Sequence, residues 1–145
     1  AGNEAAVTEM VSAVRAACPS ACLKVILETG ELKDSGKVRR ASELAIEAGA
    51  DFIKTSTGKV SVNATLEAAD IMLQAIRDSR KKVGFKPAGG IATVADADLY
   101  LRLAETIMGA NWLMPSTFRF GASGLLDDIL ATIAGTAGPR AATGY

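Results

Sequence analysis

The chain has 145 residues, with 16 lysines and arginines balanced by 16 aspartates and glutamates, and no histidine. Its length suits one domain, and a hydrophobic fraction of 49% is enough to form a buried core. The lack of histidine excludes a Ser-His-Asp triad and any histidine metal ligand. The even charge balance argues against a nucleic-acid or membrane-surface partner.

Two cysteines, Cys18 and Cys22, are spaced four residues apart. They cannot complete a four-ligand zinc site by themselves, so we expect no metal and treat both as small buried thiols. They form no disulfide framework, which is typical of a reducing compartment. No apolar run reaches about 18 residues, and the first segment does not have the pattern of a signal peptide. We therefore expect a cytoplasmic protein.

Short apolar runs alternate along the chain with segments of helical periodicity. The first segment, 4–17, is predicted to be a helix with apolar residues on one face. Next come a strand at 23–27, a loop, and a helix at 37–48 that stops at Gly49. A strand at 51–55 precedes a helix that Asn63 or Thr65 caps and that continues to Ser79. The remaining predicted elements are a strand at 83–86, a helix at 94–108, a strand at 111–114 and a helix at 124–134.

Four strands that are each followed by a helix predict an α/β fold with parallel strands. The strand spacing of about 30 residues is typical of a (β/α) barrel, but such a barrel needs eight strands and about 250 residues. A flavodoxin-like open sheet fits the length better, so the pattern leaves both folds open. In either fold ligands bind at the carboxyl ends of the strands. We expect residues 1–134 to form the folded unit and residues 135–145 to form a flexible tail.

Three lysines occupy equivalent places in successive βα units: Lys24, Lys54 and Lys86. A lysine in a buried strand is costly, although any one of them alone is most simply a solvated strand-end residue. Lysine attacks a carbonyl only as the neutral amine, and apolar walls and a second ammonium both favour that form. Since Phe52 and Ile53 precede Lys54, we predict that Lys54 is a Schiff-base nucleophile and that Lys86 tunes it electrostatically.

Glycine loops follow three successive strands and indicate an anion site. Glycine lets backbone N–H groups approach an anion closely, and a helix N-terminus adds a favourable dipole. Each loop alone is weak evidence, because glycine is routine in turns. Together, beside a Schiff-base lysine, they predict a small phosphorylated carbonyl substrate. The candidate phosphate-binding residues are Gly58, Lys59, Gly89, Gly90, Gly121 and Ser123, with Thr57 as a further hydroxyl donor.

Four motifs together resemble one enzyme family. The segments DFIKTSTGK and GFKPAGG, with LKVILETGELKD before them and FRFGAS after them, are similar in order and spacing to the deoxyribose-phosphate aldolases along essentially the whole chain. The resemblance implies a class I aldolase that needs no metal or other cofactor. It implies reversible cleavage of 2-deoxyribose 5-phosphate to glyceraldehyde 3-phosphate and acetaldehyde. The implied fold is a TIM (β/α)8 barrel, of which this chain carries the fifth to eighth βα units, preceded by one helix.

The resemblance also implies roles for individual residues. Lys54 matches the Schiff-base lysine, Lys86 the second lysine that perturbs it, and Lys24 a further lysine that lines the site. Tyr145 matches a carboxy-terminal tyrosine that assists proton transfer. The glycine loops match the family's phosphate-binding loops, and Thr57 matches a substrate-contacting hydroxyl.

Some features depart from the family pattern. Ala92 stands where longer members commonly carry arginine, and Gly124 replaces a second serine; both changes are expected to weaken phosphate binding. The first four βα units, which carry an aspartate of the proton relay, are absent. Glu28 is the nearest acidic residue, and we expect it to make structural hydrogen bonds.

The chain also begins with Ala1 and no methionine, so we expect it to be the carboxy-terminal part of a longer aldolase. Its expected partner is then the missing amino-terminal half or a second copy. The alternative is a phosphate-binding half-barrel without turnover. A nucleotide-binding open sheet is disfavoured, because neither G-x-G-x-x-G nor a P-loop motif occurs.

Overall fold

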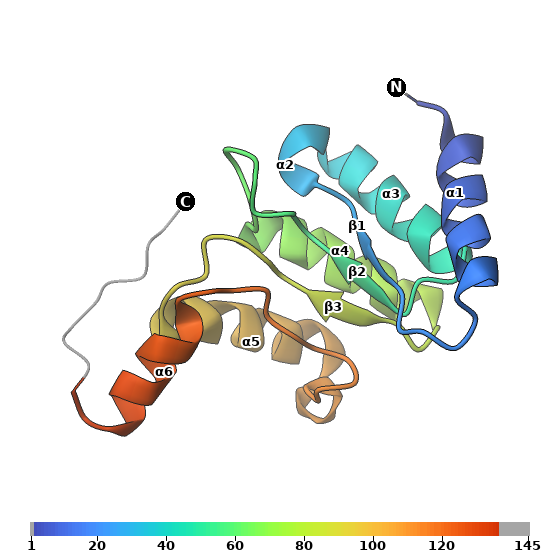
Figure 1. The fold of residues 1–145 in the computed structure, drawn as a ribbon. Helices are drawn as coiled ribbons and strands as arrows, with labels where there is room; N and C mark the ends of the chain where they lie inside the picture. Colours follow the sequence, from blue (N-terminus) through green and yellow to red (C-terminus); the bar gives the residue numbers. More distant parts are fainter. Residues whose placement is uncertain (1, 137–145) are drawn as a thin grey trace.

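The structure is a computed structural model that describes residues 2–136. Three parallel strands form one sheet in the order β1-β2-β3 (Figure 1). These strands are β1 (Lys24–Ile26), β2 (Phe52–Lys54) and β3 (Gly84–Lys86). The register places Lys24, Phe52 and Gly84 at one level, and Ile26, Lys54 and Lys86 at the next level towards the carboxyl ends. The expected parallel α/β arrangement is therefore confirmed.

Four of the described helices begin at side chains that accept hydrogen bonds from their first free backbone N–H groups. Asn3, Asp34, Thr65 and Thr93 act in this way, and Thr93 forms a reciprocal capping box with Asp96. None of the helices in residues 2–136 is long and apolar enough to cross a membrane. The helices are α1 (Glu4–Ala17), α2 (Thr29–Leu32), α3 (Ser35–Glu47), α4 (Leu66–Ser79), α5 (Val94–Met108) and α6 (Leu125–Ile133).

The predicted helices lie close to those observed. The bounds predicted for α1 and α5 are confirmed, and Thr65 rather than Asn63 caps α4. Helix α3 begins two residues earlier than predicted, because the cap is the side chain of Asp34. The prediction of a loop after β1 was wrong in one respect, since this segment contains the one-turn helix α2.

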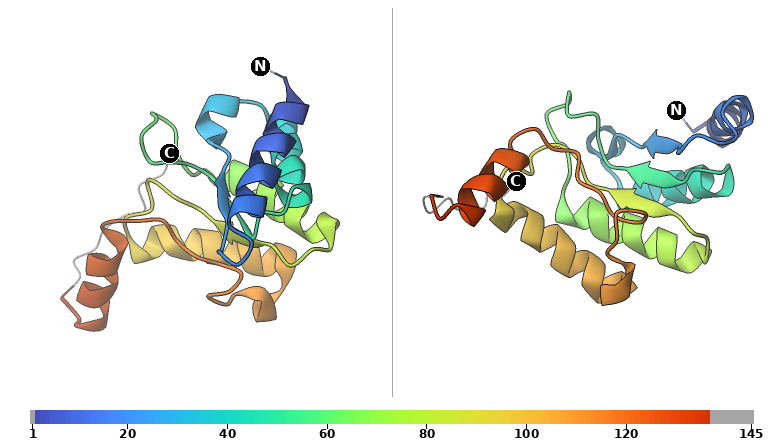
Figure 2. Two further views of the ribbon diagram at one scale, coloured as in Figure 1. Left: turned by 45° about the vertical axis from the view of Figure 1, so that its right-hand side comes forward. Right: turned by 60° about the horizontal axis from the view of Figure 1, so that its bottom comes forward.

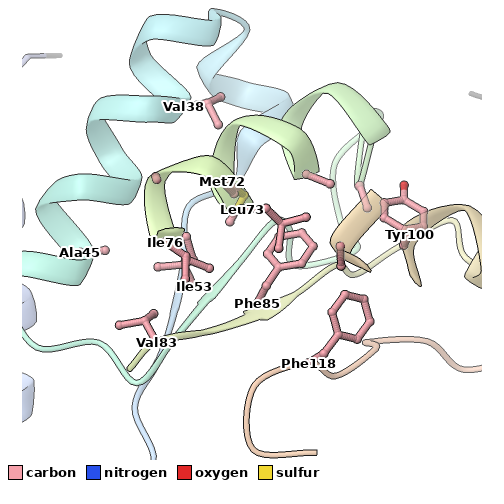
Figure 3. Close-up of a cluster of buried hydrophobic side chains, with 14 of the residues drawn as sticks. Val38, Ala45, Ile53, Met72, Leu73, Ile76, Val83, Phe85, Tyr100 and Phe118 are labelled. Atoms are coloured by element: carbon pink, nitrogen blue, oxygen red, sulfur yellow. The ribbon is translucent and has the colours of Figure 1, made fainter. Parts of the chain in front are cut away.

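Helices α3, α4 and α5 lie side by side along one face of the sheet (Figures 1 and 2). Alternate strand residues point towards this layer, and Ile53 and Phe85 are fully buried there. They meet the buried Met72 and Leu73 of α4 (Figure 3). The opposite face of the sheet, which we call the inner face, carries Lys24, Ile26, Phe52, Lys54, Gly84 and Lys86. All three candidate lysines thus share one face.

The strand predicted at 111–114 was wrong. Residues Ala110–Trp112 form a short 3₁₀ helix, and the Trp112 indole packs edge-on against the Phe118 ring with centroids 6.5 Å apart. The segment that runs parallel to β3 comes later, at 118–121, where single bridges pair Phe118 with Phe85 and Gly121 with Ala88. This segment lies beside β3 but forms only isolated bridges, so the described sheet has three strands.

Both lateral edges of this sheet are flanked by apolar side chains at the surface. Within residues 2–136, β1 pairs only with β2, and 118–121 pairs only with β3. On α1, Val11 is buried, whereas Met10 is 68% exposed. On α6, Leu126 and Ile133 are 62% and 78% exposed. Such uncovered apolar stripes are typical of surfaces that pack against further protein.

The expectation that the cysteine thiols are buried was wrong. Cys18 and Cys22 are both exposed, in the turn between α1 and β1. This turn is held by the Arg15 guanidinium, which donates to the carbonyl oxygens of Cys18 and Ala21 at 3.3 and 2.9 Å. The turn therefore does not rely on packing of the thiols.

Candidate active site

A cavity of about 440 Å³ lies at the carboxyl ends of β2 and β3 and beside segment 118–121. It brings the candidate nucleophile together with all three glycine loops, although these come from three separate βα connections. Of the residues predicted from sequence, the cavity is lined by Lys54, Thr57, Gly58, Lys59, Gly89, Gly90, Gly121 and Ser123. The structure therefore brings these residues to one cavity, whereas Lys24 and Lys86 do not line it.

The glycine at position 89 is required by close packing between two of the loops. Gly89 has a φ of +86°, and a Cβ there would lie 2.6 Å from the Cβ of Asn63. The Asn63 amide nitrogen donates to the Val60 carbonyl at 3.0 Å, which closes the loop after β2. Asn63 thus fixes the position of the β2 loop against the β3 loop. From its sequence context, Asn63 was predicted only as a candidate helix cap.

The N-terminus of α6 supplies backbone donors to the cavity wall. Ala122, Ser123 and Gly124 line the cavity just before this helix, and Gly124 offers no side chain to cap it. The first N–H groups of a helix without a side-chain cap can bind an anion, and the helix dipole favours negative charge there. The arrangement suits a phosphate group. Ala92 and Gly124, the two departures from the family pattern, both border this cavity.

Lys86 is the register partner of Lys54 on the neighbouring strand. It does not line the cavity, but its side chain passes close to Gly121, where an added Cβ would lie 3.0 Å from the Lys86 Cε. Burial lowers the pKa of Lys86, and repulsion from Lys54, then Lys24, then Arg119 lowers it further. Lys86 therefore gives up its proton more readily than an ordinary lysine.

The hydroxyl of Thr57 is engaged within the protein. It donates to the Glu28 carboxylate at 2.5 Å and accepts from the Lys59 backbone N–H at 3.2 Å. The Thr57 backbone N–H also donates to Glu28, at 3.1 Å. Glu28 itself has a left-handed φ of 53°. The structural hydrogen bonds expected of Glu28 are present, and they hold the loop that carries Lys59.

Lys24 is not among the residues that line the cavity. The Lys24 ammonium lies 5.8 Å from the centre of the Phe52 ring, one level below Lys54 on the inner face. Tyr145 lies outside the described residues. Within residues 2–136, no cluster of three or more cysteine, aspartate or glutamate side chains could hold a metal ion.

Arg119 is a charged residue near the lysines that was not predicted from the sequence. It acts electrostatically on Lys86, and its guanidinium carbon lies 5.0 Å from the centre of the Phe52 ring. The alternation in Phe118-Arg119-Phe120-Gly121 was the available signal, because a two-residue period predicts a strand with Arg119 and Gly121 on one face. Assigning this segment to a loop concealed the residue.

Comparison with known proteins identifies the family. The sequence profile described as DeoC/LacD family aldolase matches residues 1–130. This chain belongs to the DeoC/LacD family of aldolases. The resemblance noted in its motifs is thereby confirmed. The deoxyribose-phosphate aldolase of Agrobacterium fabrum (strain C58 / ATCC 33970) is 75% identical over 146 residues, which cover 100% of this chain and 56% of that protein.

Solved structures agree with this family assignment. The apo form of a protein described as a deoxyribose-phosphate aldolase from Toxoplasma gondii ME49 has a TM-score of 0.83 at 27% identity, covering 91% of this chain and 53% of that chain. A similarly described protein from Coccidioides immitis has a TM-score of 0.76 at 32% identity, covering 90% and 47%. This aldolase chain thus spans about half the length of the relatives it matches.

Proposed function

We propose that this chain supplies the Schiff-base lysine and the phosphate-binding loops of a class I deoxyribose-phosphate aldolase. One observation carries the proposal: Lys54 lines the same cavity as the three glycine loops, with Lys86 beside it in register. In this proposal the chain forms the last four βα units of a TIM barrel, counting segment 118–121 as the fourth strand. The inner face then lines the barrel interior.

The proposed reaction begins at Lys54. Its neutral amine attacks the aldehyde carbon of open-chain 2-deoxyribose 5-phosphate, and a C–N bond forms. The resulting carbinolamine receives one proton from the Lys86 ammonium, its hydroxyl leaves as water, and a protonated imine remains. The neutral form of Lys86, which its lowered pKa favours, takes the proton that Lys54 must lose before it attacks. Lys86 is therefore the base that prepares the nucleophile.

Cleavage then uses the imine as an electron sink. A base removes the proton from the hydroxyl on carbon 3, the bond between carbons 2 and 3 breaks, and glyceraldehyde 3-phosphate leaves. The electron pair of that bond converts the protonated imine to an enamine. Protonation of carbon 2 and addition of water to the imine then release acetaldehyde and restore Lys54. No metal or other cofactor takes part in this proposed sequence.

The phosphate group is proposed to bind at the far side of the cavity from Lys54. Backbone N–H groups of Gly89, Gly90 and the first turn of α6 are the donors, with the Ser123 hydroxyl and the Lys59 ammonium. Thr57 contributes by ordering the loop that carries Lys59, because its hydroxyl is already bonded to Glu28. Lys24 is proposed to act from below the cavity, as a further positive charge on the inner face.

Completion of the site is proposed to need further protein. The unpaired sheet edges and the exposed apolar stripes on α1 and α6 suit the missing half-barrel, in the same polypeptide or in trans, or a second copy of this chain. The same observations favour the second candidate function, a phosphate-binding half-barrel without turnover when alone. Tyr145 is proposed to assist protonation of the enamine, so its removal should slow proton exchange at the acetaldehyde methyl group more than it lowers stability.

A cleavage assay tests both candidate functions. Release of acetaldehyde from 2-deoxyribose 5-phosphate is measured for the 145-residue chain alone, with a separately made amino-terminal half, and within the longer polypeptide. We expect turnover in the longer polypeptide, little in the chain alone, and recovery on adding the amino-terminal half. The variant Lys54→Arg should abolish turnover in every case. Absence of turnover in the longer polypeptide would refute the aldolase proposal, and full turnover by a monomer of the chain alone would refute the need for a partner.

A further inference from the structure

Arg119 is held firmly on the inner face of the sheet. Its backbone N–H donates to the Phe85 carbonyl at 3.1 Å, and the Phe85 N–H donates to the Thr117 carbonyl at 2.7 Å, so the residue is locked in register with β3. Its neighbour Phe118 points to the buried core, which turns the Arg119 side chain to the inner face. The Nε of Arg119 also donates to the Pro115 carbonyl at 2.7 Å.

The absence of a side chain at Gly84 lets the guanidinium reach across β3 to β2. The Phe52 ring occupies the space above Gly84, where an added Cβ would lie 2.3 Å from the Phe52 Cε1. The ring is almost fully buried, and the Arg119 guanidinium carbon lies 5.0 Å from its centre. Arginine stacks well on aromatic faces, and such a contact limits where its charge can lie. The Lys24 ammonium approaches the same ring, at 5.8 Å.

The charged groups that act on Lys86 are all positive. Lys54 on β2, Lys24 on β1 and Arg119 on segment 118–121 each repel its ammonium, in that order of strength, after burial. The two lysines lose this effect whenever they are neutral, and Lys54 must be neutral to attack a carbonyl. A guanidinium stays charged throughout the accessible pH range. Of the three positive charges that repel the Lys86 ammonium, the charge of Arg119 is therefore the one that remains throughout the reaction.

We propose that Arg119 is a positioning residue: anchored by Pro115 and the Phe52 ring and next to Lys86 in strand register, it keeps a permanent positive charge on the inner face and so favours the neutral form of Lys86. The proposal rests on the aldolase function, in which Lys86 is the proton acceptor. The proposal accounts for an arginine at this position, because a guanidinium stays charged throughout the accessible pH range. It assigns to the FRFG motif a role distinct from phosphate binding.

The test is the titration of Lys86 in the intact protein, followed by NMR of ¹⁵N-labelled lysine side chains. In Arg119→Gln the pKa of Lys86 should rise, because a repelling charge is removed. In Arg119→Lys the pKa of Lys86 should stay near its value in the unmodified protein, because lysine keeps a positive charge at this position. Arg102→Gln is the matched control, since this exposed arginine pairs with Asp98 on α5 and does not act on Lys86. Arg119 is exposed, so its variants are expected to fold.

The outcomes separate this proposal from the proposed function. An unchanged Lys86 titration in Arg119→Gln would overturn the role of Arg119, whatever the activity of the protein. An upward shift of equal size in Arg102→Gln would also overturn it, because the effect would then reflect net charge alone. The pH profile of imine formation gives the second readout: its rising limb should move to higher pH in Arg119→Gln and return in Arg119→Lys. Titration as expected without imine formation would refute the aldolase function and leave the electrostatic role standing.

Discussion

Lys54 and Lys86 are register partners at the carboxyl ends of neighbouring parallel strands. This relationship puts two amines on the same face of the sheet at the same level, where one ammonium disfavours the other. Burial is the largest cause of the lowered pKa of Lys86, and repulsion from the Lys54 ammonium lowers it further. A pair of this kind is what imine chemistry near neutral pH requires, because one amine must be free of its proton.

Replacing Lys86 by methionine should change the pH dependence of stability. In the folded protein the pKa of Lys86 is lowered from its ordinary value of 10.5, so charging this residue opposes folding at neutral pH. Lys86→Met should therefore raise the free energy of unfolding near pH 7. As pH rises towards 10.5 the unmodified protein should gain stability relative to the variant, because its folded state loses the proton first. Urea unfolding across this range measures the effect, and a difference that grows with pH would contradict it.

Replacing Gly84 by alanine should strain the sheet. An added Cβ would lie 2.3 Å from the Phe52 Cε1, and overpacking of this kind costs about 1–3 kcal/mol. The double variant Gly84→Ala/Phe52→Leu should recover part of the loss. Gly124→Ala is the control, because nothing lies within 4 Å of its added Cβ. Denaturant unfolding of the three variants checks this, and a neutral Gly84→Ala would show that the ring moves aside freely.

Lys59 should contribute to phosphate affinity through its charge. It is exposed on the cavity wall, and an exposed ion pair contributes up to about 1 kcal/mol, so Lys59→Met should weaken binding of inorganic phosphate roughly fivefold. The effect should shrink as salt is added. Lys82→Met, an exposed lysine outside the cavity wall, should leave the affinity unchanged. Calorimetric titration distinguishes them, and equal losses in both variants would mean that only overall charge matters.

Asp51 should stabilise the end of the sheet that lies opposite the cavity. Its carboxylate accepts from the Leu23 backbone N–H at 2.7 Å and pairs with the Arg15 guanidinium, which also donates to the Gly49 carbonyl at 3.0 Å. Asp51→Ala leaves these donors without their acceptor, and we expect a loss of about 1–2 kcal/mol in a site that is half exposed. Asp98→Ala, which breaks the exposed pair with Arg102, should cost much less. Thermal unfolding ranks the two, and similar losses would contradict the role of Asp51 in joining α1 to the sheet.

The helices and the first three strands were predictable from local patterns. Capping residues such as Thr93 and glycine stops such as Gly49 determine helix ends within a few residues. The segment that lies beside β3, at 118–121, was not predicted. A strand was predicted at 111–114 instead, because that apolar run has the composition of a strand. The structure forms a turn there that packs Trp112 on Phe118, a contact that depends on the tertiary fold. Local composition could not indicate it.

The residues that line the site were also predictable, but their interactions were not. The regular spacing of Lys24, Lys54 and Lys86 predicted that they share one face of the sheet. The glycines after the strands predicted which loops line the site. The engagement of the Thr57 hydroxyl by Glu28 depends on a left-handed backbone at Glu28, which its residue type does not indicate. The reach of Arg119 to Phe52 depends on the empty position at Gly84 on the strand between them. Both contacts join segments that are distant in sequence, so they depend on tertiary packing and not on local residue patterns.

The most direct measurement is to trap the imine and locate it. The protein is incubated with acetaldehyde, reduced with borohydride, digested, and mapped by mass spectrometry. Our account predicts an ethyl group on Lys54 and none on Lys86 or Lys24. In the Lys54→Arg variant, it predicts no ethyl group on any residue of the inner face. An ethyl group on Lys86 or Lys24 with Lys54 unmodified would contradict it.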